Sequence, residues 1–157
     1  MKLEEIEKDL GKKQIEDILE KFDWEIFEKI VAEIFERNDF KVKHNFRFKT
    51  KSRYQIDVIA VKQNKIFCVD CKQWGKGRYK KSGLKQAVKQ QEKRVKELKK
   101  FLKKNMIAQK MLKVDSDSKF YSLIVTLLQE DMIKENETFI VPVWKLNHFL
   151  IELELFL

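Results

Sequence analysis

Two long stretches of the chain have apolar residues at the spacing of an amphipathic helix. Residues 24–37 repeat apolar side chains every three or four positions, directly after Asp23, a preferred N-cap residue. Residues 82–104 have a narrower apolar stripe, and lysines occupy the opposite side. A shorter pattern at residues 2–19 predicts another helix. We therefore expect two long helices, with the N-terminal helix as an extension.

Between the two long helices the apolar pattern changes to a period of two, which indicates β-strands. Two apolar runs there are separated only by Gln63 and Asn64, which predicts a hairpin. The expected strands lie at residues 40–43 and 46–48, 55–62, 65–72, 121–128 and 138–143, and a short C-terminal element follows them. The order helix, three strands, helix, strand, strand predicts an α/β fold in which helices flank a central mixed sheet.

The composition is typical of one globular domain. The chain has 157 residues, of which 43% are hydrophobic, with 4 Gly and 1 Pro. We expect a single domain over residues 1–157, with a core of about 22–143. No apolar run is long enough to span a membrane, the first residues lack the apolar segment of a secretory signal, and 2 Cys cannot build a disulfide framework. These features favour a cytoplasmic protein without a membrane partner.

The charge is distributed unevenly. The formal net charge is +9, and the excess of Lys and Arg lies within residues 37–104, whereas both ends of the chain are acidic. Such polarity predicts a surface for a polyanion, and nucleic acid is the commonest one. The alternative is a lysine-rich helix that is exposed to solvent and keeps the protein soluble.

Two aspartates interrupt the apolar runs of the expected hairpin. If the two residues between the runs form the turn, Lys62 pairs with Lys65 and Asp57 lies directly opposite Asp70. Opposed side chains have Cβ atoms about 4.5–5.5 Å apart, where like charges repel. Two partly buried carboxylates at this distance must share a proton or bind a cation. Carboxylate pairs that also face phosphate suit a hard divalent ion such as Mg²⁺.

Two further residues are candidates for the same site. Lys72 lies two positions after Asp70 and shares its face of the strand, while Cys71 points away. An ammonium there can orient or deprotonate a water, or neutralise charge on a phosphate, although an ordinary ion pair with Asp70 is the alternative. Glu28 lies at the edge of the first helix's apolar stripe, where it can reach toward the sheet. Edge glutamates are also ordinary boundary residues.

In this order the candidates resemble the motifs of the PD-(D/E)XK nuclease superfamily. More narrowly, they are similar to its archaeal and Mrr-like restriction-endonuclease branch and to the related Holliday-junction resolvases. The matching stretches are residues 27–32, 55–60 and 69–74, and the resemblance covers about residues 22–104. Ile56 precedes Asp57 where the superfamily pattern has proline, and Asp70 stands in place of the more frequent glutamate.

The resemblance implies a restriction-endonuclease-like fold that hydrolyses DNA phosphodiester bonds with Mg²⁺ or Mn²⁺. The implied metal ligands are Asp57, Asp70, the backbone carbonyl of Cys71, and Glu28, which would bind the metal or its water shell. Lys72 would position or activate the attacking water. Gln91 falls inside the apolar stripe of the second long helix, and related nucleases use a glutamine on this helix near the active site. A structural hydrogen bond is the alternative role of Gln91.

Basic segments flank the proposed site and are expected to contact the phosphate backbone of DNA. The expected nucleic-acid-binding residues are Lys49, Lys51, Arg53, Trp74, Lys76, Arg78, Lys80, Lys81, Lys85 and Lys89. The first hypothesis is a metal-dependent DNA endonuclease. A junction resolvase is the second, and it would have to be a symmetric dimer; the apolar end at residues 149–157 would supply the interface or complete the core. The third is a nucleic-acid-binding module of the same fold that does not cleave.

Overall fold

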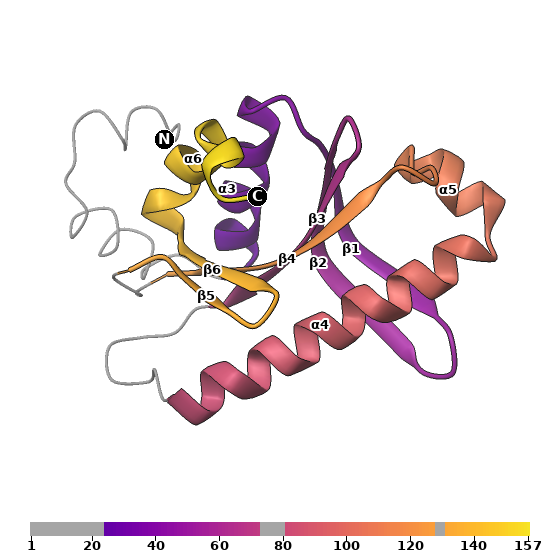
Figure 1. The fold of residues 1–157 in the computed structure, drawn as a ribbon, viewed down its shortest axis with the longest axis horizontal. Coiled ribbons are helices and arrows are strands. Elements are labelled where there is room, and N and C mark those ends of the chain that lie inside the picture. Colours follow the sequence, from indigo (N-terminus) through magenta and orange to yellow (C-terminus); the bar gives the residue numbers. More distant parts are fainter. Residues whose placement is uncertain (1–23, 73–80, 128–130) are drawn as a thin grey trace.

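The fold is built on one mixed β-sheet (Figure 1). The computed structural model describes residues 24–72, 81–127 and 131–157. The six strands follow the order β1-β2-β3-β4-β6-β5. The strands are β1 (Lys41–Lys49), β2 (Arg53–Lys62), β3 (Lys65–Lys72), β4 (Lys119–Thr126), β5 (Ile133–Glu135) and β6 (Thr138–Pro142). The helices are α3 (Trp24–Arg37), α4 (Lys81–Lys103), α5 (Met106–Leu112) and α6 (Val143–Ile151), and the 3-10 helix η1 (Leu153–Leu155) follows them.

The strand directions combine two arrangements in one sheet. β1, β2 and β3 are antiparallel neighbours, β3, β4 and β6 run parallel, and β5 is an antiparallel edge strand. The connection from β3 to the parallel β4 contains α4, because parallel neighbours need a long crossover. This confirms the predicted α/β fold with a mixed sheet flanked by helices, which is consistent with a restriction-endonuclease-like fold.

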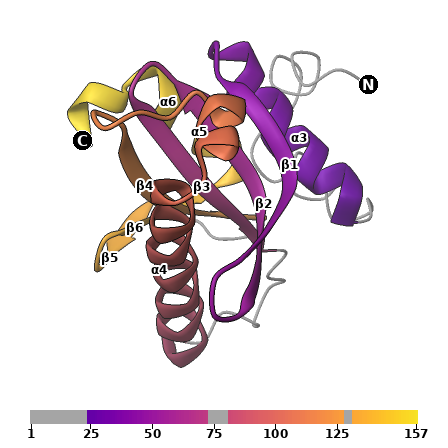
Figure 2. The ribbon, with the colours of Figure 1, turned by 90° about the vertical axis from the view of Figure 1, so that its right-hand side faces the viewer.

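Helices cover both faces of the sheet (Figure 2). α3 and α6 pack on one face, here called the α3 face, where Phe27, Phe35 and Phe149 belong to the core cluster. α4 and α5 pack on the other, here called the α4 face, through residues such as Leu98 and Leu112. β3 is buried on both faces, which explains its continuous apolar run. β1 is an edge strand whose exposed lysines disfavour pairing with another chain.

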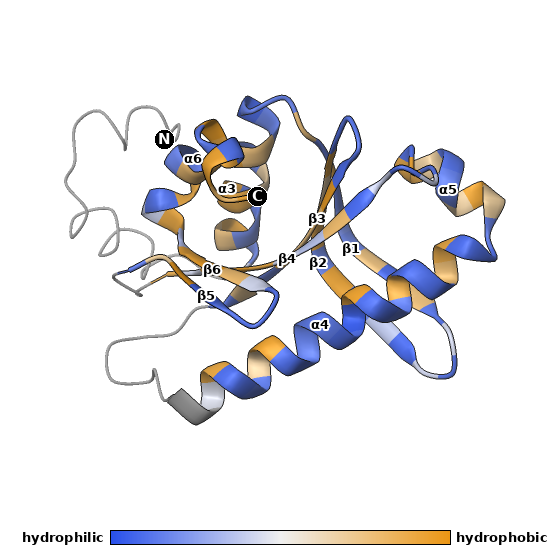
Figure 3. Ribbon diagram, viewed as in Figure 1, coloured by the Kyte–Doolittle hydropathy of each residue, from blue (hydrophilic) through white to orange (hydrophobic). Residues whose placement is uncertain are grey.

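The two long helices are found where the sequence pattern predicts them. α3 has the expected bounds, and α4 begins and ends one residue earlier than expected. The predicted apolar stripe of α4 is buried and its lysine side faces solvent, so that the two colours alternate along the helix (Figure 3). The predicted helix at residues 2–19 and the N-cap Asp23 lie outside the described residues. In the part of the chain that the structure describes, no helix is long and apolar enough to cross a membrane.

The hairpin register is confirmed. Lys62 pairs with Lys65, and the turn between them places Gln63 at a φ of 54°, the left-handed conformation that two-residue hairpin turns require. The runs expected at residues 40–43 and 46–48 are parts of one strand, β1.

Two elements were not predicted from the sequence pattern. α5 and β5 are too short for a periodic pattern to show, and the expected C-terminal element is helix α6 with η1. Phe149, Leu150 and Leu153 of this end join the core on the α3 face. Ile151 and Leu155 are 66% and 76% exposed. The apolar C-terminal end therefore mostly completes the core.

Candidate active site

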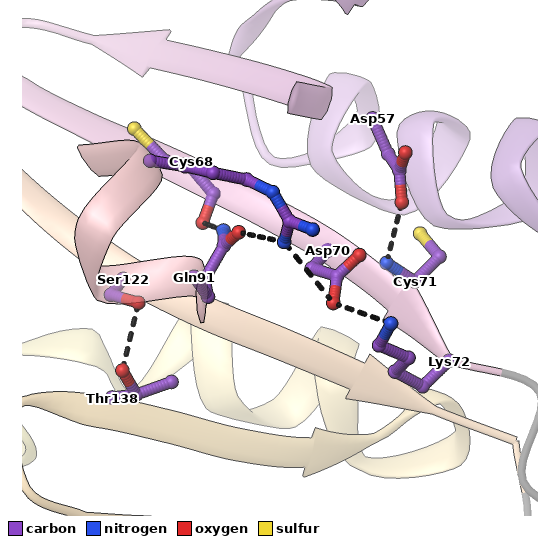
Figure 4. Close-up of polar contacts among 9 residues, drawn as sticks. Asp57, Cys68, Asp70, Cys71, Lys72, Gln91, Ser122 and Thr138 are labelled. Atoms are coloured by element: carbon purple, nitrogen blue, oxygen red, sulfur yellow. Dashed lines mark hydrogen bonds and ion pairs between the residues drawn. The ribbon is translucent and has the colours of Figure 1, made fainter. Parts of the chain in front are cut away.

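The site lies where β2 and β3 separate. Their ladder has the predicted register from the turn to the pair Val58–Val69 but stops there, so Asp57 and Asp70, the next two positions, do not form the direct cross-strand pair that the sequence predicts. Beyond that pair the backbone N–H of Cys71 donates a hydrogen bond of 3.0 Å to Oδ2 of Asp57 (Figure 4). The Asp57 carboxylate thus accepts from β3 in the place of a backbone carbonyl. We call this divergence beyond Val58–Val69 the β2–β3 fork.

Asp57 lies at an irregularity of β2 that the sequence does not reveal. Ile56 belongs to the core cluster of the α4 face, whereas Val58 belongs to that of the α3 face. Residues two apart in a regular strand share a face, so the alternation breaks at Asp57. By the register of β1 and β2, Asn45 of β1 lies opposite Asp57, and Asn45 has a φ of 48°. Both strands are therefore irregular at the position where the Asp57 carboxylate bonds to the backbone of β3.

Asp70 is the more buried of the two aspartates. It is 7% exposed, and its Oδ2 lies 3.3 Å from Nζ of Lys72. Lys72 therefore shares the face of Asp70 as predicted, while Cys71 is buried in the cluster of the α3 face. Oδ2 of Asp70 accepts no well-aligned hydrogen bond from the described residues, so its contact with Lys72 is a charge interaction.

The surroundings of Asp70 favour a proton or another cation on its carboxylate. Burial, together with the charge of Asp57 and a hydrogen bond with it, raises the pKa of Asp70 to about 6. The Lys72 ammonium opposes the rise. The charge of Asp57 is thus close enough to disfavour the charged form of Asp70. Such a pair is relieved by a shared proton or by a bound cation.

Glu28 of α3 belongs to the same electrostatic group. Its side chain is buried, in contrast to the exposed Glu25 and Glu36 of the same helix. Burial raises the pKa of Glu28, the charge of Asp57 raises it further, and a hydrogen bond with Trp24 lowers it. Glu28, at the helix edge predicted from the apolar stripe, therefore faces the site, and the charge of Asp57 affects its pKa more than the charge of Asp70 does.

The donor set suits a hard divalent cation. Carboxylate oxygens from Asp57 and Asp70 and the backbone carbonyl of Cys71 are ligands of the type that Mg²⁺ prefers. The buried Oδ2 of Asp70, which lacks a hydrogen bond from the described residues, is an oxygen that a cation would satisfy. Within residues 24–72, 81–127 and 131–157, no three His, Cys, Asp or Glu side chains are grouped to hold a metal. Two carboxylates are nevertheless a usual protein contribution to a Mg²⁺ site, because water and phosphate fill the other positions.

Gln91 and Arg94 connect α4 to the site. Gln91 is fully buried, and its Nε2 donates a 2.8 Å hydrogen bond to the carbonyl of Cys68 in β3. Its Oε1 accepts a 3.1 Å hydrogen bond from NH1 of Arg94, and the same NH1 lies 3.9 Å from Oδ2 of Asp70. Gln91 thus makes the structural hydrogen bond that its position predicts. Sequence reasoning missed Arg94, although a residue three positions after Gln91 shares its helix face.

The described nucleic-acid-binding candidates are exposed. Lys49, Lys51 and Arg53 lie at the tip of the β1–β2 hairpin, and Lys85 and Lys89 lie on the solvent side of α4. Thr50 donates a 2.8 Å hydrogen bond to Glu97 of α4, which holds the tip against that helix. A hollow of about 480 Å³ beside this bond is lined by Lys49, Thr50, Lys51, Glu97, Lys100, Phe101, Lys104 and Asn105. Trp74, Lys76, Arg78 and Lys80, and the side chain of Lys81, lie outside the described residues.

Comparison with known proteins identifies the family. Residues 23–127 match the model of the nuclease-related domain (NERD), a segment that contains Glu28, Asp57, Asp70 and Lys72. A comparison with curated proteins found no match. The match covers well over half of the chain, and the family lies within a PD-(D/E)XK-like nuclease superfamily, which implies nuclease function and nucleic-acid binding. The chain therefore belongs to the nuclease-related domain family.

Proposed function

We propose that the protein is a metal-dependent endonuclease that hydrolyses phosphodiester bonds in DNA with Mg²⁺ or Mn²⁺. The observation that carries the proposal is the proximity of the Asp57 and Asp70 side chains at the β2–β3 fork, with the Lys72 ammonium 3.3 Å from Asp70. Asp70 is buried and Asp57 is half-buried, and two neighbouring carboxylates in such a place are costly unless a cation balances them. The Lys72 ammonium faces Oδ2 of Asp70 at the same place.

Each residue has a distinct role in this proposal. Asp57, Asp70 and the backbone carbonyl of Cys71 would hold the ion, and Glu28 would bind it or its water shell. When bound, such an ion neutralises phosphate charge and makes water more acidic. Lys72, held on Asp70, would position or activate the attacking water and offset negative charge on the phosphate.

DNA would be bound through its phosphates. The exposed lysines of α4 and of the hairpin tip present positive charge on the side of the sheet that also carries Asp70. Backbone-directed binding of this kind depends strongly on salt, because each contact releases counterions. By the order of its motifs we also propose that the domain is of the archaeal or Mrr-like type and acts in the cytoplasm.

A second candidate is a nuclease specific for four-way junctions. Such an enzyme would be a symmetric homodimer, and the exposed Ile151 and Leu155 at the C-terminal end favour an interface there. Cleavage of four-way junctions compared with linear duplex of the same sequence separates the two candidates, and the mass of the protein in solution tests the dimer.

The proposal is tested by nicking of supercoiled plasmid in Mg²⁺, in Mn²⁺ and in EDTA. Wild type is compared with Asp57→Asn and Lys72→Gln, and with the matched exposed controls Asp117→Asn and Lys110→Gln. We expect metal-dependent nicking by wild type and both controls, and a loss of about 10²-fold or more in the two site variants. Binding of DNA without any nicking would instead support a non-cleaving module, and equal nicking by all variants would rule out this site.

A further inference from the structure

Two cations from different elements converge on one oxygen of Asp70. Nζ of Lys72 in β3 lies 3.3 Å from Oδ2, and NH1 of Arg94 in α4 lies 3.9 Å from the same atom. Both side chains are partly exposed, at 29% and 26%, so they approach from the solvent side. A divalent ion on Asp70 would repel both cations. Lys72, Arg94 and the ion would together carry an excess of positive charge, which an anion beside the ion would balance. In the proposed reaction that anion is the phosphodiester.

Arg94 is anchored at one nitrogen and available at the others. Its NH1 donates to Oε1 of Gln91, whose own amide is fixed by the bond to the Cys68 carbonyl. The 3.9 Å contact with Asp70 is longer than a hydrogen bond. Within the described residues, Nε and NH2 of Arg94 donate no hydrogen bond. A guanidinium held in this way keeps a planar pair of donors, the geometry that matches two oxygens of a phosphate.

We propose that Arg94 binds the phosphate at which DNA is cut, as a further catalytic residue; this inference rests on the proposed nuclease function. Gln91 would keep the guanidinium beside the fork while its free donors bind a non-bridging phosphate oxygen. Hydrolysis forms a bond from the water oxygen to phosphorus and breaks the bond between phosphorus and the leaving sugar oxygen. One proton of the water is transferred to that sugar oxygen. The other proton passes to solvent. Arg94 remains charged throughout and stabilises the negative charge that gathers on the phosphate.

The alternative is that Arg94 only positions Asp70 by linking α4 to β3. The two roles differ in what removal of the guanidinium does to the ion. A positioning role predicts weaker metal binding, with cleavage restored by more metal. A phosphate-binding role predicts metal affinity that is unchanged or higher, because a repelling charge is removed, together with slow cleavage at saturating metal.

The experiment compares wild type, Arg94→Gln, Arg94→Lys and the control Arg37→Gln, which removes an arginine from a surface ion pair on α3. Three quantities are measured: Mn²⁺ affinity without DNA, from the electron paramagnetic resonance of free Mn²⁺; the unfolding temperature; and the single-turnover cleavage rate at saturating protein and Mn²⁺. We expect Arg94→Gln to cleave about 10²-fold more slowly or worse, with Mn²⁺ affinity no weaker than wild type. Arg94→Lys should recover part of the rate, and Arg37→Gln should match wild type.

Cleavage by Arg94→Gln within threefold of wild type, or a parallel loss of Mn²⁺ affinity and rate, would overturn the inference. If wild type cleaves no substrate, the proposed function fails, and the role of Arg94 is then decided by DNA binding. In that case Mn²⁺ should tighten DNA binding by wild type and not by Arg94→Gln. An equal effect of Mn²⁺ on both proteins would overturn the inference.

Discussion

The backbone N–H of Cys71 donates a 3.0 Å hydrogen bond to the carboxylate of Asp57 at the point where β2 and β3 stop pairing. This bond gives the same residue a structural and a proposed catalytic role. It satisfies a backbone donor in a residue that is fully buried, and it fixes one carboxylate beside the other. Variants at Asp57 should therefore separate stability from activity.

The structural role predicts that two substitutions at Asp57 differ in stability. The amide oxygen of Asp57→Asn can still accept from Cys71, whereas Asp57→Ala leaves that buried N–H without its acceptor, which costs about 1–3 kcal/mol. We expect Asp57→Ala to be less stable than Asp57→Asn by that amount, while both lose metal-dependent cleavage. Urea denaturation measures the difference, and equal stabilities would show that the bond contributes nothing.

The raised pKa of Asp70 predicts how stability depends on pH in the absence of metal. The folded protein holds the proton up to a pKa of about 6, while an unfolded aspartate releases it near its ordinary pKa of 3.8. The unfolded state therefore binds fewer protons between these values, so the free energy of unfolding should fall as pH rises through this window.

Replacing Asp70 by asparagine should remove this dependence. Asp70→Asn should match wild type below about pH 4 and be more stable at pH 7, by on the order of 3 kcal/mol, although it cannot support cleavage. Denaturation in EDTA across this pH range, with Asp117→Asn as an exposed control, measures both effects. A wild-type stability that rises from pH 4 to 6, with no change in Asp70→Asn, would contradict the prediction.

Metal should stabilise the fold in a pH-dependent way. Because a proton and a cation compete for Asp70, saturating Mn²⁺ should raise the unfolding temperature at pH 8 and have little effect at pH 5. At about 100 times its dissociation constant, an ion adds roughly 2.7 kcal/mol to the free energy of unfolding. Asp57→Asn should lose the shift at pH 8, and Asp117→Asn should keep it. Equal shifts in both variants would place metal binding elsewhere.

The fold and most of the site geometry followed from local rules. The helical spacing of apolar residues predicted α3 and, to within one residue at each end, α4. The short turn at Gln63 and Asn64 predicted the register of the β2–β3 hairpin as far as Val58 and Val69, next to the two aspartates. The register of a hairpin is set by its turn and by the alternation of side chains every two residues, and both can be recognised in the sequence.

Other features depend on contacts that a single sequence does not specify. The break of alternation at Asp57 accompanies a left-handed residue in the neighbouring strand, Asn45, which no periodicity encodes. In the sequence Arg94 is one of many cations on a lysine-rich helix. Only its position in the structure, between Gln91 and Asp70, distinguishes it. α5 was missed because seven residues give too few repeats for an apolar stripe.

Basic residues on α4 should affect DNA affinity without affecting chemistry. Replacing Lys85 and Lys89 together by glutamine should weaken DNA binding and lower the slope of log K against log salt by about 0.9 for each phosphate that is no longer neutralised. The single-turnover rate at saturating protein should stay unchanged, because neither side chain contacts Asp70. Lys110→Gln combined with Lys113→Gln, two exposed lysines at the C-terminal end of α5, is the charge-matched control. An equal slope in the two double variants would show that the α4 lysines do not contact DNA.

The central claim is that the two aspartates of the fork hold one divalent ion. A crystal soaked in Mn²⁺ near pH 8 tests it most directly through the anomalous scattering of manganese. The account predicts a single strong peak within bonding distance of carboxylate oxygens of both Asp57 and Asp70, and no peak there in Asp57→Asn. A wild-type crystal that binds Mn²⁺ elsewhere, while Asp57 and Asp70 share a proton without an ion, would contradict it.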